Sequence, residues 1–278
     1  MWDDGDLLAV RERPPSAREV HLWTIAPDAP PEVADQLATV LDAAARRRCS
    51  GLPDARRARS FVAVHGAVRV ILGRYRGTAP DRLGLRAGRW GKPELVDGDG
   101  LRFSLTHSGG AVLLAVTGGG RDVGVDIEGG RPGGAAEALA ARYFPPQESA
   151  LVASAAPGRR RDTSLRLWTR KEACVKAAGA RLALGLGLPV AGDGDVRLVD
   201  DPTGRLPAPW LVRDLDAPAG YRAAVAMAGP EPYAVRRRRL RPSDLACHLG
   251  TAPGPAGGDP GPSAGNRFVD LTEGETQP

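Results

Sequence analysis

The stretch that decides the fold is Val123-Gly124-Val125-Asp126-Ile127-Glu128, in which apolar and acidic residues alternate. Because successive side chains of a β-strand point to opposite faces, the apolar residues can face a core while Asp126 and Glu128 share the other face. Two carboxylates on one face repel each other unless they are solvated or share a cation. Taken alone, the stretch favours solvated acids. It also suits half of a Mg²⁺ site, because Mg²⁺ takes one or two carboxylates together with substrate phosphates.

The composition is that of a globular protein. The sequence is 42% hydrophobic and 26% charged, within the usual globular range. Its length of 278 residues is enough for one large domain or two ordinary ones. The formal net charge is +5, and arginines cluster at residues 46–48 and 236–239. Such clusters favour anionic partners such as phosphates, nucleic acid or an acidic protein, although codon bias also produces arginine-rich compositions.

The cysteines and the hydropathy pattern bear on the compartment. Cys49, Cys174 and Cys247 show no metal or redox spacing, which favours a reducing compartment. The first residues are acidic and polar, unlike a signal peptide, and the clearest apolar run, residues 111–116, is far too short to span a bilayer. We therefore expect a soluble, cytoplasmic protein.

The periodicity of the chain predicts mixed helices and strands. The first expected helix runs from Pro31 through Arg46–Arg48 and ends before Gly51, and two others run from Asp54 to Gly77 and from about Thr163 to Ala178. The expected strands are 19–26, 101–106, 111–117, 123–128, 196–199, 209–214 and 221–227. Residues 155–162 read as a basic loop. Residues 230–278 form a basic and then Gly/Pro-rich tail, which we expect to be disordered.

A second informative segment is Trp168-Thr169-Arg170-Lys171-Glu172-Ala173-Cys174-Val175-Lys176. Trp168, Glu172 and Lys176 are spaced by four, so they share one face of the predicted helix. Trp168 can anchor that face and leave Glu172 and Lys176 at its rim. An ordinary Glu–Lys pair at this spacing is common and contributes only about 0.2–0.5 kcal/mol, so the pair alone is weak evidence for a site.

Four segments occur in a fixed order: Gly91-Lys92-Pro93, Phe103-Ser104-Leu105-Thr106-His107-Ser108, Gly124-Val125-Asp126-Ile127-Glu128 and the helical segment from Trp168 to Lys176. Together they resemble the signature of the Sfp-type 4′-phosphopantetheinyl transferases over roughly residues 18–229. The resemblance implies an α+β fold, built as a pseudo-twofold pair of similar α/β halves with the active site in the cleft between them. We expect an N-terminal half over residues 1–118, a C-terminal half over 119–229 and the tail over 230–278.

The resemblance also implies an activity. An enzyme of this type is Mg²⁺-dependent and transfers the 4′-phosphopantetheine arm of coenzyme A, its co-substrate, to a serine hydroxyl of an apo carrier protein. Adenosine 3′,5′-bisphosphate is released. The partner would be an acyl, polyketide or peptidyl carrier, as in secondary-metabolite biosynthesis. The resemblance implies a monomer, and it points neither to a membrane nor to nucleic acid.

Matching positions supply the expected site residues. The metal ligands would be Asp126, Glu128 and Glu172, an all-oxygen set that suits Mg²⁺ beside a diphosphate. Glu172 is also the candidate general base, with Lys176 as the second catalytic residue. The expected coenzyme A contacts are Lys92, Thr106, His107, Arg48 and Arg59. The two arginines are candidates for the 3′-phosphate, where a guanidinium fork fits well.

Several positions depart from the family pattern or fit it loosely. Ser104 and Thr106 stand where the family usually has Asn and often Ser, and we expect tuned phosphate contacts from them. Glu148 matches a family acid, but a plain helix N-terminal charge explains it at least as well. His21, His65 and His248 are interpreted as structural or exposed, and Cys174 as a packed thiol.

A second hypothesis is a non-catalytic protein that binds anions or nucleic acid through its arginine clusters and a flexible basic tail. Its affinity for nucleic acid would fall steeply with salt. The sequence argues against this hypothesis, because such a protein has no need of Asp126, Glu128 and Glu172 together.

Overall fold

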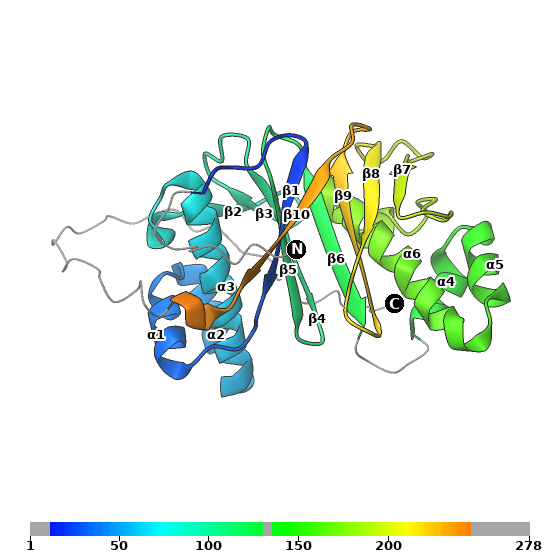
Figure 1. Ribbon diagram of the computed structural model, residues 1–278. Coiled ribbons are helices and arrows are strands. Elements are labelled where there is room, and N and C mark those ends of the chain that lie inside the picture. The colour runs from blue at the N-terminus through cyan, green and yellow to red at the C-terminus, as the bar shows by residue number, and fades with distance from the viewer. Residues whose placement is uncertain (1–11, 130–134, 246–278) are drawn as a thin grey trace.

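A computed structural model describes residues 12–129 and 135–245, and Figure 1 shows their arrangement. Two four-stranded sheets lie between two layers of helices. The N-terminal sheet has the order β10 (Ala234–Leu240), β1 (Glu19–Ile25), β5 (Ala111–Thr117) and β4 (Arg102–Ser108). The C-terminal sheet has the order β6 (Val123–Gly129), β9 (Tyr221–Ala228), β8 (Trp210–Leu215) and β7 (Val196–Val199). A small hairpin joins β2 (Leu85–Ala87) to β3 (Pro93–Leu95).

The helices cover the outer face of each sheet (Figure 1). Those on the N-terminal sheet are α1 (Pro31–Thr39), α2 (Ala43–Ser50) and α3 (Ala55–Arg76). Those on the C-terminal sheet are α4 (Ala135–Tyr143), α5 (Pro146–Ser154) and α6 (Pro157–Ala178). Single 3₁₀ turns occupy Pro80–Arg82, Leu182–Leu184 and Pro242–Leu245. Apolar side chains fill three layers, one beneath each set of helices and one between the two sheets.

The predicted helices are confirmed, with one break inside a helix and one change at a helix start. Asp42 breaks the first predicted helix in two, because its carboxylate accepts a hydrogen bond from the backbone N–H of Ala45 (2.8 Å) and starts α2. Helix α6 begins at Pro157, so the predicted basic loop at 155–162 is wrong over most of its length. Proline suits the first turn of a helix, and arginine is a good helix former. Gly179, in the left-handed conformation at φ 58°, ends α6 as predicted.

The basic run at residues 236–239 is not part of an unstructured tail. It lies in β10, which pairs in parallel with β1 from Glu19↔Ala234 to Ile25↔Leu240. Charged side chains are typical of an edge strand, because they discourage pairing with further strands. Arg238 donates to Glu12 (2.7 Å), and its guanidinium carbon lies 5.4 Å from the centroid of the Trp23 ring. The prediction of a disordered tail is therefore wrong for residues 234–245, and residues 246–278 lie outside the described residues.

The α+β class is confirmed, and each half contributes one 22-residue helix, α3 or α6. A two-fold relation between the halves stays a prediction. The chain returns through β10 to the N-terminal sheet, so the fold does not end at residue 229. Over 12–129 and 135–245, the structure contains no helix that is both long and apolar enough to cross a membrane.

Candidate active site

Helix α6 lies directly on strand β6, because Gly124 has no side chain. A Cβ atom added at Gly124 would collide with the carbonyl oxygen of Ala173 and the backbone nitrogen of Ala177. This close approach is typical of a strand glycine that faces a neighbouring backbone. It brings the last turns of α6, which carry Glu172 and Lys176, to the acidic face of β6.

We expect Gly124→Ala to destabilise the protein by about 3 kcal/mol, the usual upper range for overpacking a tight contact. Thermal unfolding followed by circular dichroism measures the effect. Gly158→Ala is the matched control, because Gly158 lies on α6, the helix that Gly124 contacts, and has nothing within 4 Å of its added Cβ. The control should change stability by less than about 1 kcal/mol. Equal stabilities for the two variants would contradict the close contact.

Asp126 is the most buried acid of the site, with 2% of its surface exposed. Its Oδ1 accepts hydrogen bonds from Thr106 Oγ1 (3.0 Å) and from the Lys176 ammonium (2.6 Å). Its Oδ2 is buried and has no hydrogen-bond partner within the described residues. One oxygen of this carboxylate is therefore anchored, while the other carries an unsatisfied charge, a costly arrangement unless a ligand meets it.

Glu172 is half-buried on α6 and close to both acids of β6. Burial and the charges of Asp126 and Glu128 together raise the pKa of Glu172 to about 7, while the charge of Lys176 opposes them. The three predicted metal ligands thus share one electrostatic environment. They do not form a ready-made cage, since no group of three or more His, Cys, Asp or Glu side chains suited to a metal ion occurs among the described residues.

Lys176 supplies the positive charge at this point. Burial alone would lower its pKa, but the carboxylates of Asp126 and Glu172 outweigh burial and raise the pKa of the ammonium group. Its Nζ also donates to Thr106 Oγ1 (3.1 Å). Lys176 therefore stays charged at neutral pH and connects α6 to both β4 and β6.

Lys92 and His107 are two further predicted contacts of coenzyme A. Lys92 donates to the carbonyl oxygen of Val123 (3.0 Å), and burial lowers its pKa to about 8. His107 is exposed at the other side of the site; partial burial and the charges of Lys176 and Arg48 lower its pKa, which favours the neutral imidazole at pH 7. Lys92 therefore lies at the start of β6, and His107 lies within electrostatic reach of Asp126.

Comparisons of the sequence with known proteins show its family. A sequence model of the 4′-phosphopantetheinyl transferase superfamily matches residues 122–226. The 4′-phosphopantetheinyl transferase HetI of a Nostoc species is 39% identical over 170 residues, which cover 59% of this chain and 70% of HetI. This chain belongs to the 4′-phosphopantetheinyl transferase family. A relative from Bacillus subtilis is 28% identical over 204 residues, 71% of this chain and 86% of the relative, and Sfp of Bacillus subtilis is 28% identical over 148 residues, 51% and 62% of the two chains.

The resemblance stated from the four sequence segments is thereby confirmed. The individual site residues of this family member stay predictions, although the structure brings several of them together. Asp126, Thr106 and Lys176 are in direct contact, and Glu172 and Glu128 lie within electrostatic reach of them. Arg59 is exposed on α3, so its predicted contact with the 3′-phosphate rests on the resemblance alone.

His65 was interpreted as structural or exposed, and a structural role fits its contacts. Its ring stacks on Phe61 with 4.0 Å between ring centroids, a contact that the sequence analysis did not name. The guanidinium carbon of Arg48 lies 5.4 Å from the centroid of the same Phe61 ring. Burial, Arg48 and His107 lower the pKa of His65 to about 3, so this neutral ring lies near both predicted coenzyme A contacts. The four-residue spacing from Phe61 on α3 was the available signal.

Glu148 and His21 have structural roles. The carboxylate of Glu148 is buried, forms an ion pair with Lys171 (2.6 Å) and accepts from the backbone N–H groups of Val190 (2.6 Å) and Ala191 (2.7 Å). It lies in the first turn of α5, as the helix N-terminal interpretation predicts, and it also links α5 and α6 to the loop before β7. His21 is buried, with its Nδ1 2.7 Å from the Tyr75 hydroxyl, as expected of a structural histidine.

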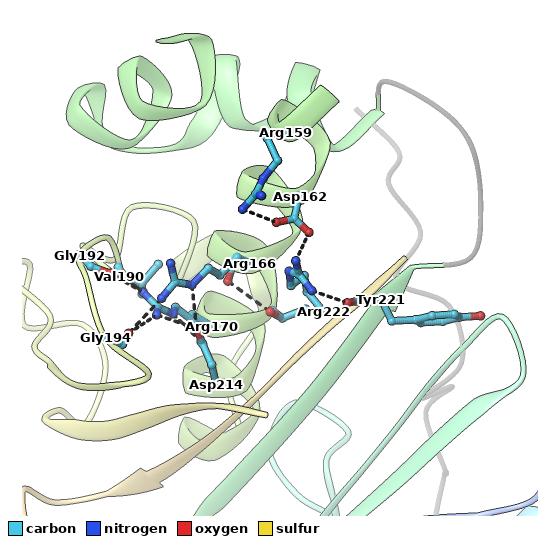
Figure 2. A network of polar contacts seen from close by, with 11 residues as sticks. Arg159, Asp162, Arg166, Arg170, Val190, Gly192, Gly194, Asp214, Tyr221 and Arg222 are labelled. Carbon is cyan, nitrogen blue, oxygen red and sulfur yellow. Dashed lines mark hydrogen bonds and ion pairs between the residues drawn. The ribbon is translucent and has the colours of Figure 1, made fainter. Parts of the chain in front are cut away.

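An arginine network holds α6 in place on the C-terminal sheet (Figure 2). Arg166 and Arg170 both bind the carboxylate of Asp214 on β8, with distances of 2.7 Å from each Nε. Arg222 on β9 forms an ion pair with Asp162, nearer the start of the same helix. Arg170 is almost fully buried and binds both carboxylate oxygens of Asp214. Such bidentate, charge-assisted hydrogen bonds are strong and fix the orientation of both side chains. Glu172 and Lys176 thus project from a rigid support.

Proposed function

We propose that this protein transfers the 4′-phosphopantetheine arm of coenzyme A to a serine hydroxyl of an apo carrier protein and releases adenosine 3′,5′-bisphosphate. Family membership supports the reaction class. The observation that carries the proposal is the state of Asp126, a buried carboxylate with one oxygen anchored by Thr106 and Lys176 and the other unsatisfied. An ordinary anion-binding surface would not bury such an acid beside two more carboxylates.

The residues present fit Mg²⁺. The unsatisfied Oδ2 of Asp126 is a hard oxygen donor, and Glu128 and Glu172 lie within electrostatic reach of it. Because Mg²⁺ typically takes one or two carboxylates and completes its shell with water and substrate phosphates, no complete protein cage is required. We propose that Asp126, Glu128 and Glu172 hold the ion, which when bound would neutralise charge on the diphosphate.

The other residues then bind and orient the substrates. Lys176, Lys92 and His107 contact the diphosphate region, Thr106 lies beside it, and Arg48 and Arg59 bind the 3′-phosphate. Glu172 is the general base for the incoming serine, directly or through water, as the resemblance implies. The nucleophile belongs to the carrier, so the chain needs no serine–histidine–aspartate triad.

The finer properties belong to the same proposal. The enzyme acts as a monomer in the cytoplasm, on acyl, polyketide or peptidyl carriers, including those of secondary metabolism. Its two halves are related by a pseudo-twofold axis, and the substrate lies between them. The contact of Thr106 on β4 with Asp126 on β6 supports a site shared by both halves.

The test is incorporation of a labelled phosphopantetheine arm from coenzyme A into purified apo carriers of the three types, followed by intact-protein mass spectrometry. We expect the mass of at least one carrier to rise by one phosphopantetheine arm when Mg²⁺ is present. A carrier whose acceptor serine is replaced by alanine is the control and should stay unmodified. Absence of transfer to every carrier of the panel would refute the proposed function.

The alternative of a non-catalytic nucleic-acid-binding protein gains no support. That hypothesis requires a flexible basic tail, but the arginines at residues 236–239 belong to strand β10. Three of them already pair with acids: Arg236 with Glu19 at 3.6 Å, Arg237 with Asp216 at 2.7 Å and Arg238 with Glu12 at 2.7 Å.

A further inference from the structure

Three hydroxyl groups of β4 reach across to β6. Ser104 Oγ accepts from the backbone N–H of Val125 (3.2 Å), Thr106 Oγ1 donates to Asp126 Oδ1 (3.0 Å), and Ser108 Oγ donates to Glu128 Oε2 (3.0 Å). Residues two apart on a strand share a face, so the three hydroxyls form one row. We call Ser104, Thr106 and Ser108 the hydroxyl row.

The hydroxyl row joins two different sheets. Strand β4 is the edge of the N-terminal sheet and β6 is the edge of the C-terminal sheet, and no main-chain ladder pairs them in the part of the chain that the structure describes. Side-chain hydroxyls therefore provide hydrogen bonds across the boundary between the halves. Two of these hydroxyls, those of Thr106 and Ser108, bind carboxylates that the proposed function assigns to the metal. The hydroxyls belong to the N-terminal half, whereas the carboxylates belong to the C-terminal half.

Each of these bonds orients a carboxylate. A hydroxyl that donates to a carboxylate oxygen forms a charge-assisted bond and restricts the rotation of the acid. At Asp126 the result is visible, because Oδ1 is engaged and Oδ2 is left for a ligand. Ser108 makes the corresponding bond to Oε2 of Glu128, and its Oγ lies slightly farther, 3.3 Å, from the carbonyl oxygen of Gly129 at the end of β6.

We propose that Ser108 is a positioning residue of the metal site, acting through Glu128 as Thr106 acts through Asp126. The N-terminal half would thereby set the affinity of carboxylates that the C-terminal half carries. This inference rests on the proposed function. Ser108 itself does not touch the substrate in this assignment. Hydrogen-bond partners of metal ligands commonly change metal affinity by about 10- to 100-fold when they are removed.

Ser108 is well suited to a test, because its side chain can be removed with little damage to the fold. It is the last residue of β4, half-buried, and its backbone pairs with Ala111 whatever the side chain. Tyr221 holds the following turn independently, through a hydrogen bond from its hydroxyl to the carbonyl oxygen of Gly109 (3.0 Å).

The experiment measures Mn²⁺ binding by electron paramagnetic resonance, with and without coenzyme A, and the Mg²⁺ concentration that gives half-maximal transfer. We expect Ser108→Ala to weaken Mn²⁺ binding about tenfold and to raise the required Mg²⁺ by a similar factor. Ser108→Thr keeps the hydroxyl and should stay within about threefold of the wild type. Ser154→Ala, which removes an exposed hydroxyl bonded only to the Leu151 carbonyl oxygen at the end of α5, should leave both readouts unchanged.

The possible outcomes separate this inference from the proposed function. If the wild type transfers the arm and Ser108→Ala binds Mn²⁺ as tightly as the wild type, the positioning role is overturned while the function stands. The positioning role is also overturned if Ser108→Thr loses as much affinity as Ser108→Ala, or if the wild type transfers the arm but binds no Mn²⁺. If the wild type transfers nothing to any carrier, the proposed function itself fails. Circular dichroism melting curves confirm that each variant is folded.

Discussion

Asp126→Asn is expected to lower the rate of phosphopantetheine transfer by on the order of 10³-fold, the largest loss that we predict for a single residue. The substitution preserves the shape of the side chain and its capacity to accept from Thr106. It removes the charge from the one site carboxylate that has a buried, unsatisfied oxygen. If that oxygen binds the metal that stabilises the diphosphate, an amide in its place cannot supply the lost charge.

The measurement is the single-turnover rate at saturating coenzyme A and Mg²⁺, which reports the chemical step. Asp216→Asn is the matched control, because Asp216 directly follows β8, is exposed and pairs with Arg237 at 2.7 Å. The control should retain nearly full activity. A folded Asp126→Asn enzyme within about tenfold of the wild-type rate would remove Asp126 from the metal site.

The local sequence pattern predicts the individual strand and helix of the site better than it predicts the contact between them. Alternation predicted β6 with Asp126 and Glu128 on one face, and the four-residue spacing predicted the face of α6 that carries Glu172 and Lys176. The hydrogen bonds from β4 to both Asp126 and Glu128 confirm the first prediction. The interactions of both Glu172 and Lys176 with Asp126 confirm the second. Period and spacing describe one element at a time, so they could place each acid on an element but could not show that the elements touch. The family resemblance supplied that step.

The hydroxyl row illustrates what local patterns cannot show. Ser104, Thr106 and Ser108 were visible as alternating polar residues, and phosphate contacts were expected of the first two. The structure buries Ser104 and points its hydroxyl at the backbone of Val125. Such a bond depends on where the edge strands of two separate sheets come to lie, which is a property of the whole fold.

The errors at the ends of elements have a related cause. The arginines of β10 read as a solvated tail, since polarity without periodicity is typical of disorder. The backbone of an edge strand forms hydrogen bonds with one neighbouring strand only, and such a strand tolerates charged side chains. Its composition can therefore resemble that of a tail. Only the pairing with β1, more than two hundred residues away in sequence, distinguishes the two cases.

Lys176→Met is expected to lower kcat/KM for coenzyme A by about 100-fold while it tightens Mn²⁺ binding in the absence of coenzyme A by at least about tenfold. Methionine keeps the length and the apolar packing of the lysine stem. The lost ammonium is the partner of Asp126 Oδ1 at 2.6 Å, so the charge of the acids is no longer balanced from within the chain. A divalent cation then meets a more negative site, whereas the diphosphate loses a positive contact.

The opposite signs of these two effects distinguish the role of Lys176 from general damage to the site, which would weaken both. Transfer kinetics and Mn²⁺ titration by electron paramagnetic resonance measure them on the same preparation. Lys176→Arg is the control that keeps the charge, and it should leave Mn²⁺ binding close to that of the wild type. Weaker Mn²⁺ binding by Lys176→Met would show that the lysine supports the metal site through structure. In that case the ion pair of Lys176 with Asp126 would not be what weakens metal binding in the wild type.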